Sequence, residues 1–126
     1  MRNFIAYHNA KTMGYSCTAI LTPQVRTKNS VSGLTGVKVW LIAGEGERPK
    51  SYYLASTFVA DQCRPAHFPD PKLPNLIAGA GTNFGLSISI SGSSLLELLK
   101  SDSANFRRGF YETFDHTVIS QLQRLA

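Results

Sequence analysis

The sequence has no acidic residue before Glu45, although that opening stretch contains five lysine or arginine residues. The whole chain carries 8 Asp and Glu against 13 Lys and Arg, which gives a formal net charge of +5. The excess belongs to residues 1–60, which hold seven basic and two acidic side chains, because residues 61–126 hold six of each. Charge confined in this way favours one positive face that binds a polyanion. An ordinary solvated surface remains the alternative.

Cysteine is scarce, since only Cys17 and Cys63 are present, 46 positions apart. A structural zinc site needs four ligands that usually come as close pairs, so we expect neither a metal nor another cofactor. We expect two free thiols in a reducing compartment, with a disulfide left open. Long apolar runs are also missing. The sequence therefore predicts no signal peptide and no membrane partner, and indicates a cytoplasmic protein.

The few acidic residues are too scattered to form an evident catalytic centre. A metal-dependent nuclease needs clustered carboxylates near a lysine. Glu45 and Glu47 share one predicted loop with Lys50, whereas Asp70 comes much later. The chain also lacks a P-loop lysine and a Gly-x-Ser-x-Gly elbow. We therefore predict no catalytic residue, and a small nuclease using Glu45, Glu47 or Asp70 remains an alternative.

Several runs have the composition of β-strands in a chain long enough for a single domain over residues 1–126. Val37–Ala43 and Ser51–Asp61 are joined by a loop with glycine and proline, which predicts a β-hairpin. Both faces of this hairpin are largely apolar, so we expect it at the centre of a curved sheet or barrel. The other predicted strands are Phe4–Tyr7, an edge strand at Thr18–Val25, a strand starting at Leu76–Ala78, and Leu86–Ile90.

Alternation along the hairpin predicts which residues share a face. In the first strand, one face carries Val37, Val39 and Leu41, and the other carries Lys38, Trp40 and Ile42. In the second strand, one face is predicted to carry Tyr52, Leu54, Ser56 and Phe58. Two other segments are predicted to be irregular: 64–74, which contains four prolines, and 79–85, which is interpreted as a glycine-rich turn.

Two helices are predicted near the C-terminus. Ser94 and Glu97 have the spacing of a capping box that opens a helix over Leu95–Lys100. Asp115 is predicted to cap a second helix over His116–Leu125, whose apolar residues form one stripe. Because strands come first and helices last, the sequence predicts an α+β protein, a small and mostly antiparallel β-barrel with C-terminal helices.

Aromatic, amide and hydroxyl side chains gather in Tyr7–Ser16, inside the acid-free stretch. A flipped base needs flat partners for its faces and polar groups for its edge. The candidate base-pocket residues are Tyr7, His8, Asn9, Met13, Tyr15, Ser16, Trp40, Tyr53 and Asn83. Tyr7, Tyr15, Trp40 or Tyr53 would stack on the base, and Asn9, Ser16 and Asn83 would address its edge. The candidate phosphate-binding residues are Lys11, Arg26, Lys28, Arg48 and Lys50. A core tryptophan at Trp40, and a helical turn packed over a barrel end at Tyr7–Ser16, are the alternatives.

The layout also resembles a known superfamily. The opening strand within Asn3–Asn9, the pair Val37–Ala43 and Tyr52–Asp61, and the segments Ser94–Leu99 and Asn105–Phe110 before a closing helix are similar to PUA-like domains of the EVE and YTH branch. The resemblance implies a small barrel that accommodates a modified base in an aromatic pocket, in DNA or RNA. The chain has a single tryptophan, Trp40, where YTH domains have an aromatic cage with several.

The resemblance further implies the reader part of a modification-dependent restriction system, with a nuclease as a further domain or subunit. We therefore expect a non-enzymatic module that binds nucleic acid, DNA rather than RNA, and reads a modified or flipped base. A protein-interaction domain without nucleic-acid binding is the remaining alternative. In that case the proline-rich segment and exposed aromatic residues would form the interface.

Overall fold

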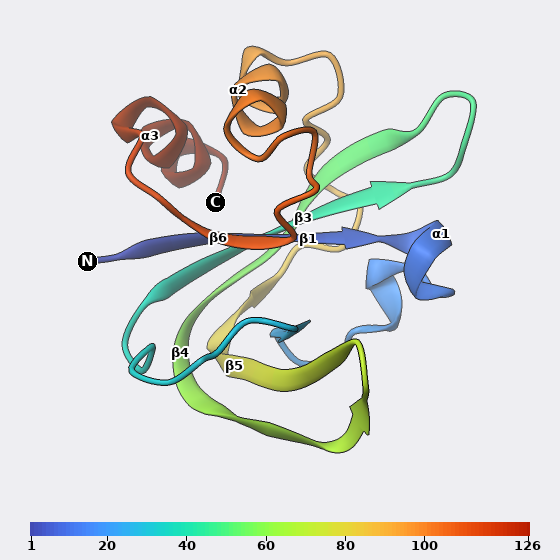
Figure 1. Cartoon of the computed structure of the whole chain (residues 1–126). Coiled ribbons are helices and arrows are strands. Elements are labelled where there is room, and N and C mark those ends of the chain that lie inside the picture. The colour runs from blue at the N-terminus through green and yellow to red at the C-terminus, as the bar shows by residue number, and fades with distance from the viewer.

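The computed structural model describes the backbone of residues 1–126, and the side chains of all but residues 68–70. Six strands form one sheet in the order β2-β5-β4-β3-β1-β6, which curls into a half-barrel (Figure 1). The strands are β1 (Asn3–Asn9), β2 (Gln24–Thr27), β3 (Lys38–Glu45), β4 (Ser51–Asp70), β5 (Leu73–Asn83) and β6 (Phe110–Thr113). The helices are α1 (Ala10–Met13), α2 (Ser94–Asp102) and α3 (His116–Leu125), and a 3-10 turn spans Cys17–Ala19.

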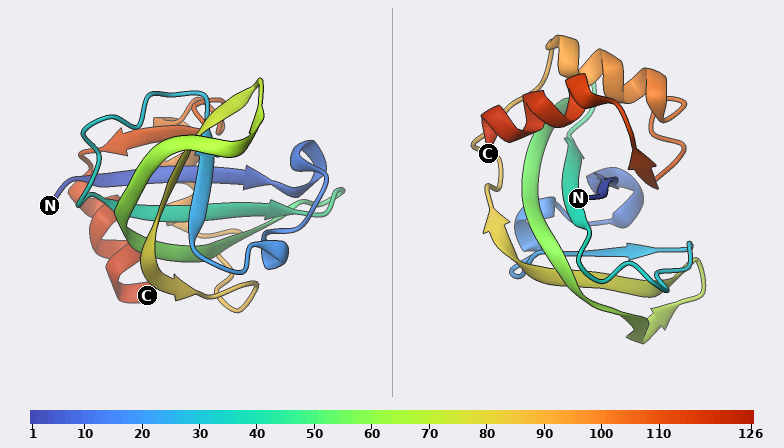
Figure 2. Two further views of the ribbon diagram at one scale, coloured as in Figure 1. Left: turned by 90° about the horizontal axis from the view of Figure 1, so that it is seen from below. Right: turned by 90° about the vertical axis from the view of Figure 1, so that its left-hand side faces the viewer.

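The predicted α+β class and the mostly antiparallel sheet are confirmed. Within the described sheet only β1 and β3 pair in parallel, and β1 lies between β3 and the edge strand β6. The sheet has two ends, β2 and β6, and α2 and α3 lie together on one side of it (Figure 2). None of the helices described in the structure has the length and apolar character needed to span a bilayer.

The two faces of the sheet carry separate cores. Inside the curl, the large buried residues are Phe4, Val39, Leu41, Phe58, Ile77 and Phe110. On the other face, Ile5, Trp40, Ile42 and Leu54 pack with the apolar residues of α2 and α3. The alternation predicted for β3 is therefore confirmed, because consecutive residues of this strand contribute to different cores.

The predicted hairpin is confirmed as β3 and β4, but β4 contains a bulge. Adjacent residues of β3 face Leu54 and Ser56, so Ala55 is an extra residue in β4. A bulge changes the phase of side-chain alternation. Leu54 accordingly packs under the helices and Phe58 inside the curl. The prediction that Tyr52, Leu54, Ser56 and Phe58 share one face is therefore wrong beyond the bulge.

The segment with four prolines is not irregular, because β4 continues to Asp70 and β5 begins at Leu73. Ala60 still forms backbone hydrogen bonds with Gly36 and Val37, but beyond it β4 pairs with β5 alone in the described sheet, so its outer edge needs no hydrogen-bond donor. A proline is tolerated at such an edge, and Pro65 lies opposite Asn75. The side chain of Asp70, which belongs to the nuclease alternative, lies outside the described side chains.

Three other boundaries differ from the predictions. Thr18–Val25 is not one strand, because a 3-10 turn occupies its start and β2 begins only at Gln24. Gly79–Asn83 belongs to β5 rather than to a turn, and the predicted strand Leu86–Ile90 forms only the isolated bridge between Tyr53 and Ser89.

The helix caps are nearly as predicted. Ser93, not Ser94, is the N-cap of α2, since its hydroxyl accepts the Leu96 N–H at 3.1 Å. Asp115 caps α3 as predicted, and Val118 and Leu122 form the buried part of its stripe. Strand β6 was not predicted, because four residues between two helical segments carry little periodic signal.

Candidate functional site

A cleft of about 690 Å³ lies at the open side of the half-barrel, between β2 and β6. It has an apolar floor from the inner core, formed by Phe4, Ile20, Val25, Leu34, Leu41 and Phe110. The side chain of Asn29, just after β2, donates to the Phe110 carbonyl at 2.9 Å and so connects the two walls. Sites for small organic ligands have this size, and here polar side chains share the lining with the apolar floor.

Both walls of the cleft are edge strands. In the described sheet β2 pairs only with β5, and β6 pairs only with β1. An edge strand has backbone N–H and C=O groups on its outer side that no neighbouring strand uses. The cleft is therefore bordered by backbone donors and acceptors as well as by side chains.

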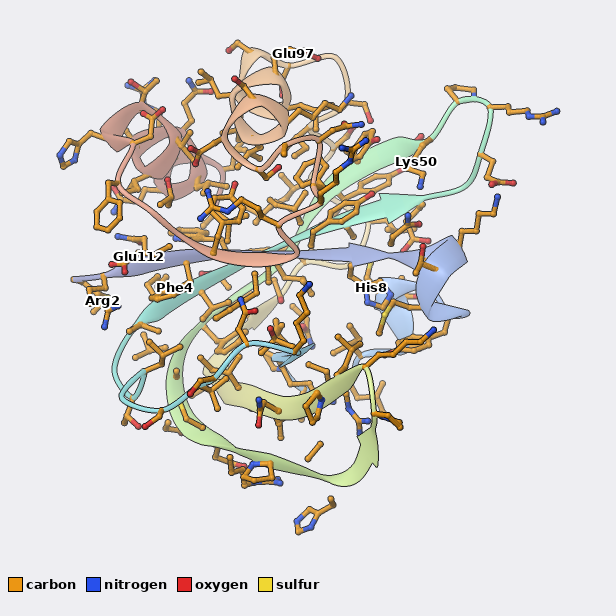
Figure 3. The ribbon with its side chains drawn as sticks, in the orientation of Figure 1. Arg2, Phe4, His8, Lys50, Glu97 and Glu112 are labelled. Carbon is orange, nitrogen blue, oxygen red and sulfur yellow. The ribbon has the colours of Figure 1, made fainter. Side chains whose placement is uncertain are left out.

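The rim of the cleft is strongly basic. Arg26 and Lys28 contribute from the β2 side, and Arg107 and Arg108 from the β6 side. Arg2 also lines the cleft, but it forms a salt bridge with Glu112, the single acidic residue among the described lining residues (Figure 3). The Arg108 guanidinium lies 4.9 Å from the centre of the Tyr111 ring, which orients it.

The inner end of the cleft is formed by His8, Met13 and Tyr15. Gly14 ends α1 in the left-handed conformation, with φ of 85°, and this reversal brings Tyr15 back over His8. The His8 Nε2 atom lies 2.9 Å from the Tyr15 carbonyl oxygen, and the two ring centres are 5.0 Å apart. His8 is 5% exposed whereas Tyr15 is 43% exposed, so Tyr15 offers a free aromatic surface.

Tyr7 borders the cleft, but its ring belongs to the opposite face of the sheet. Successive residues of β1 alternate, and the Tyr7 ring stacks on Phe106 with centres 4.2 Å apart. Tyr52 completes this aromatic cluster. Burial, with a smaller contribution from Tyr52, raises the pKa of the Tyr7 phenol. The Tyr7 ring therefore packs within the fold. Of the two tyrosines in this segment that were predicted to stack on a base, Tyr15 is the one whose ring is available in the cleft.

The other two proposed stacking residues lie elsewhere. Trp40 is 1% exposed and donates from Nε1 to the Asn3 side chain at 3.0 Å. Trp40 is therefore a core residue, which was the alternative to a stacking role, and a base cannot reach it. Tyr53 is half-buried on β4, outside the cleft. Asn83 donates to two backbone carbonyls of the segment after the 3-10 turn, at 2.9 and 3.3 Å, and also lies outside the cleft.

Three of the five predicted phosphate-binding residues are near the β3–β4 turn. Lys11 forms an ion pair with Glu47, and the Lys50 ammonium donates to the Asn9 side chain at 3.0 Å. Arg48 is exposed in the turn itself. Lys50 lies toward the end of the sheet that carries His8, away from Arg2 (Figure 3). Only Arg26 and Lys28 of this set line the cleft.

Glu45 holds the segment that follows Tyr15. Its carboxylate accepts from the Ser16 hydroxyl at 2.8 Å and from the Cys17 N–H at 2.9 Å. Burial by itself raises the pKa of Glu45, but these hydrogen bonds outweigh it and lower the pKa below its ordinary value. Burial raises the pKa of the Cys17 thiol to about 12, and Glu45 adds to this effect. Ser16 therefore serves the fold here rather than the cleft.

The two described acidic side chains of the nuclease alternative, Glu45 and Glu47, both bind other groups of the protein. Glu45 binds the 3-10 turn and Glu47 pairs with Lys11. Among the described side chains, no group of three His, Cys, Asp or Glu lies close enough together to hold a metal ion. Both Cys17 and Cys63 are free thiols.

Glu45→Gln is expected to lower the free energy of unfolding by about 1 kcal/mol at neutral pH, because charge-assisted hydrogen bonds exceed neutral ones by about this amount. A carboxyl whose pKa is lowered by folding contributes stability above its ordinary pKa of 4.5 and loses it as the pH falls through the folded value. Urea denaturation should therefore separate the two proteins at about pH 7, and this difference should shrink at about pH 3. Equal stability at neutral pH would contradict this role of Glu45.

Sequence reasoning missed the residues that come from β6 and the loop before it. Arg107 and Arg108 lie in the half of the chain with no net charge, so the charge count drew attention away from them. They are nevertheless two adjacent arginines next to a short apolar run, which is a usable signal. No family model, curated protein or solved structure matches the chain, so the site is interpreted from its geometry.

Proposed function

We propose that this chain is a non-enzymatic nucleic-acid-binding module that accepts one unstacked, modified base in the cleft between β2 and β6. The observation that carries this proposal is a cleft of about 690 Å³ that has an apolar floor and basic side chains on both of its walls. A base has flat apolar faces and a polar edge, and the sugar-phosphate backbone that carries it is a chain of anions. The cleft offers a matching partner for each part.

The interior supplies what a base requires. Tyr15 has a free aromatic surface at the inner end, and stacking on an aromatic side chain contributes about 1–3 kcal/mol per base. The outer edges of β2 and β6, which no further strand of the described sheet covers, supply hydrogen-bonding groups around the apolar floor. Readers of single bases combine these two elements, stacking for the face and hydrogen bonds for the edge.

The rim supplies contacts for phosphates. Five lysine and arginine residues line the cleft against one acid, and that acid is already paired with Arg2. Among the described side chains, those of Lys28 and Arg107 have no salt-bridge partner. Free cations on two opposite walls favour a ligand whose negative charges flank the inserted group on both sides, as phosphates flank a base.

We extend the proposal to the resemblance with PUA-like domains, with which a curled sheet that has two helices on one side agrees. On that proposal, the module is the reader of a modification-dependent restriction system and works with a nuclease domain or subunit. DNA is favoured over RNA as the ligand. The cytoplasm is the proposed location.

The proposal is tested by fluorescence anisotropy with duplexes that contain one modified base or its unmodified counterpart. Tyr15→Ala is expected to weaken binding to the preferred modified duplex by about 5-fold to 150-fold, because one stacking contact is lost, and to leave weak unspecific binding unchanged. The control is Phe114→Ala, which removes an aromatic ring that is 77% exposed and outside the cleft. Equal binding to all duplexes, with no effect of Tyr15→Ala, would exclude base reading.

A further inference from the structure

A second recess opens inside the half-barrel, next to the cleft. It has a volume of about 320 Å³ and shares Ile20 and Leu41 with the cleft, so these two residues border both spaces. Its other walls come from the 3-10 turn, the bulge of β4 and the segment after β5, including Cys17, Ala55 and Phe84. The two spaces are therefore neighbours.

Ser56 is the unusual residue in the wall of the recess. It is 1% exposed, and among the described residues its hydroxyl has no hydrogen-bond partner. Buried side-chain hydroxyls are nearly always hydrogen-bonded, so one without a partner needs an explanation. The adjacent hydroxyl of Thr57, by contrast, donates to the Val39 carbonyl at 3.0 Å.

The bulge of β4 places Ser56 in this position. Without the extra residue Ala55, Ser56 would lie on the same face as Leu54 and point toward the helices. With it, Ser56 follows the alternation of Phe58 and faces the interior of the curl. Bulges commonly redirect a side chain next to a binding site. The irregularity in the strand and the unpartnered hydroxyl therefore coincide at one residue.

We propose that this recess is the subsite for the substituent of the bound base, and that the Ser56 hydroxyl selects a substituent that carries a hydroxyl group of its own. The inference rests on the proposed function. The walls are mainly apolar and suit a methylene stem, while the Ser56 hydroxyl has a donor and an acceptor that no described group of the fold uses. A methyl substituent would leave Ser56 unpaired, so a hydroxymethyl group is the smallest substituent that satisfies the site.

The test uses two series of duplexes that differ only at one base position. One series carries cytosine, 5-methylcytosine or 5-hydroxymethylcytosine, and the other carries uracil, thymine or 5-hydroxymethyluracil. In at least one series the hydroxymethyl base is expected to bind about 2-fold to 10-fold more tightly than the methyl base, the value of one net hydrogen bond. Ser56→Ala is expected to abolish this preference and to leave the affinity for the methyl base unchanged.

Two measurements keep the result interpretable. The melting temperature of Ser56→Ala should equal or exceed that of the wild type, because the variant removes a buried hydroxyl that has no partner in the fold. Thr57→Val removes the neighbouring buried hydroxyl, which is used by the backbone, and should keep the hydroxymethyl preference. A lower melting temperature for Ser56→Ala would assign the hydroxyl a structural role and overturn the subsite.

The failure of this inference differs from the failure of the proposed function. If modified and unmodified duplexes are distinguished and Tyr15→Ala weakens binding, but Ser56→Ala leaves every ratio unchanged, the subsite is wrong and base reading stands. The same holds if neither series prefers the hydroxymethyl base while another modification is read. If no duplex is preferred and Tyr15→Ala has no effect, both proposals are overturned.

Discussion

Gly81→Ala is expected to lower the free energy of unfolding by about 3 kcal/mol or more, because it would force apart the two longest strands of the sheet. Gly81 lies in β5 opposite Phe58 of β4. A Cβ atom at Gly81 would lie 2.0 Å from the Thr57 carbonyl oxygen and 2.6 Å from the Phe58 Cα atom. Both atoms belong to the backbone of β4, so no side chain can turn away to make room. The backbones of β4 and β5 would have to move apart.

The matched control is Gly109→Ala. A Cβ atom at Gly109 would meet nothing within 4 Å, and its φ is in the ordinary range. The free energy of unfolding of Gly109→Ala should stay within about 1 kcal/mol of the wild-type value. Any change is expected to be an increase, because alanine reduces the conformational freedom of the unfolded chain. Chemical denaturation followed by circular dichroism measures both variants. A Gly81→Ala protein as stable as Gly109→Ala would contradict the close approach of β4 and β5.

The same glycines show why part of the fold was not predictable from the sequence. Gly79 and Gly81 were interpreted as part of a turn because glycine is typical of turns. In the structure they permit contact between two strands, which no local pattern reports. Pro65 is a similar case, since its place in a strand depends on that edge of β4 having no further partner. By contrast, the β3–β4 hairpin and the cap of α3 are local features, and both were predicted.

The residues of the candidate site were likewise predictable from the sequence only in part. His8 and Tyr15 were predicted from a local cluster, and the chain reversal at Gly14 does bring them together. Tyr7 was assigned to the same pocket, but strand alternation turns its ring to the opposite face. Arg107 joins the cleft because the sheet curls until β2 and β6 approach each other. That approach depends on the whole topology, so counting charges along the chain could not reveal it.

The double variant Lys28→Gln, Arg107→Gln is expected to weaken duplex binding at low salt by an order of magnitude or more and to make it less dependent on salt. Lys28 lies on the β2 side of the cleft and Arg107 on the β6 side, and both side chains are exposed. Each phosphate contact contributes about 0.9 to the slope of the logarithm of affinity against the logarithm of salt concentration. Losing two contacts should therefore reduce the slope by about 1.8.

The control is Lys38→Gln, Arg124→Gln, which removes the same charge from residues that do not line the cleft. Lys38 lies over the Trp40 ring, and Arg124 lines a recess between α2 and α3. Each double variant lowers the formal net charge of +5 by two, so attraction by total charge predicts equal losses for both. Direct phosphate contacts in the cleft predict a changed slope for Lys28→Gln, Arg107→Gln alone. Equal slopes for the two variants would mean that the nucleic acid binds to the charge of the protein and not to this cleft.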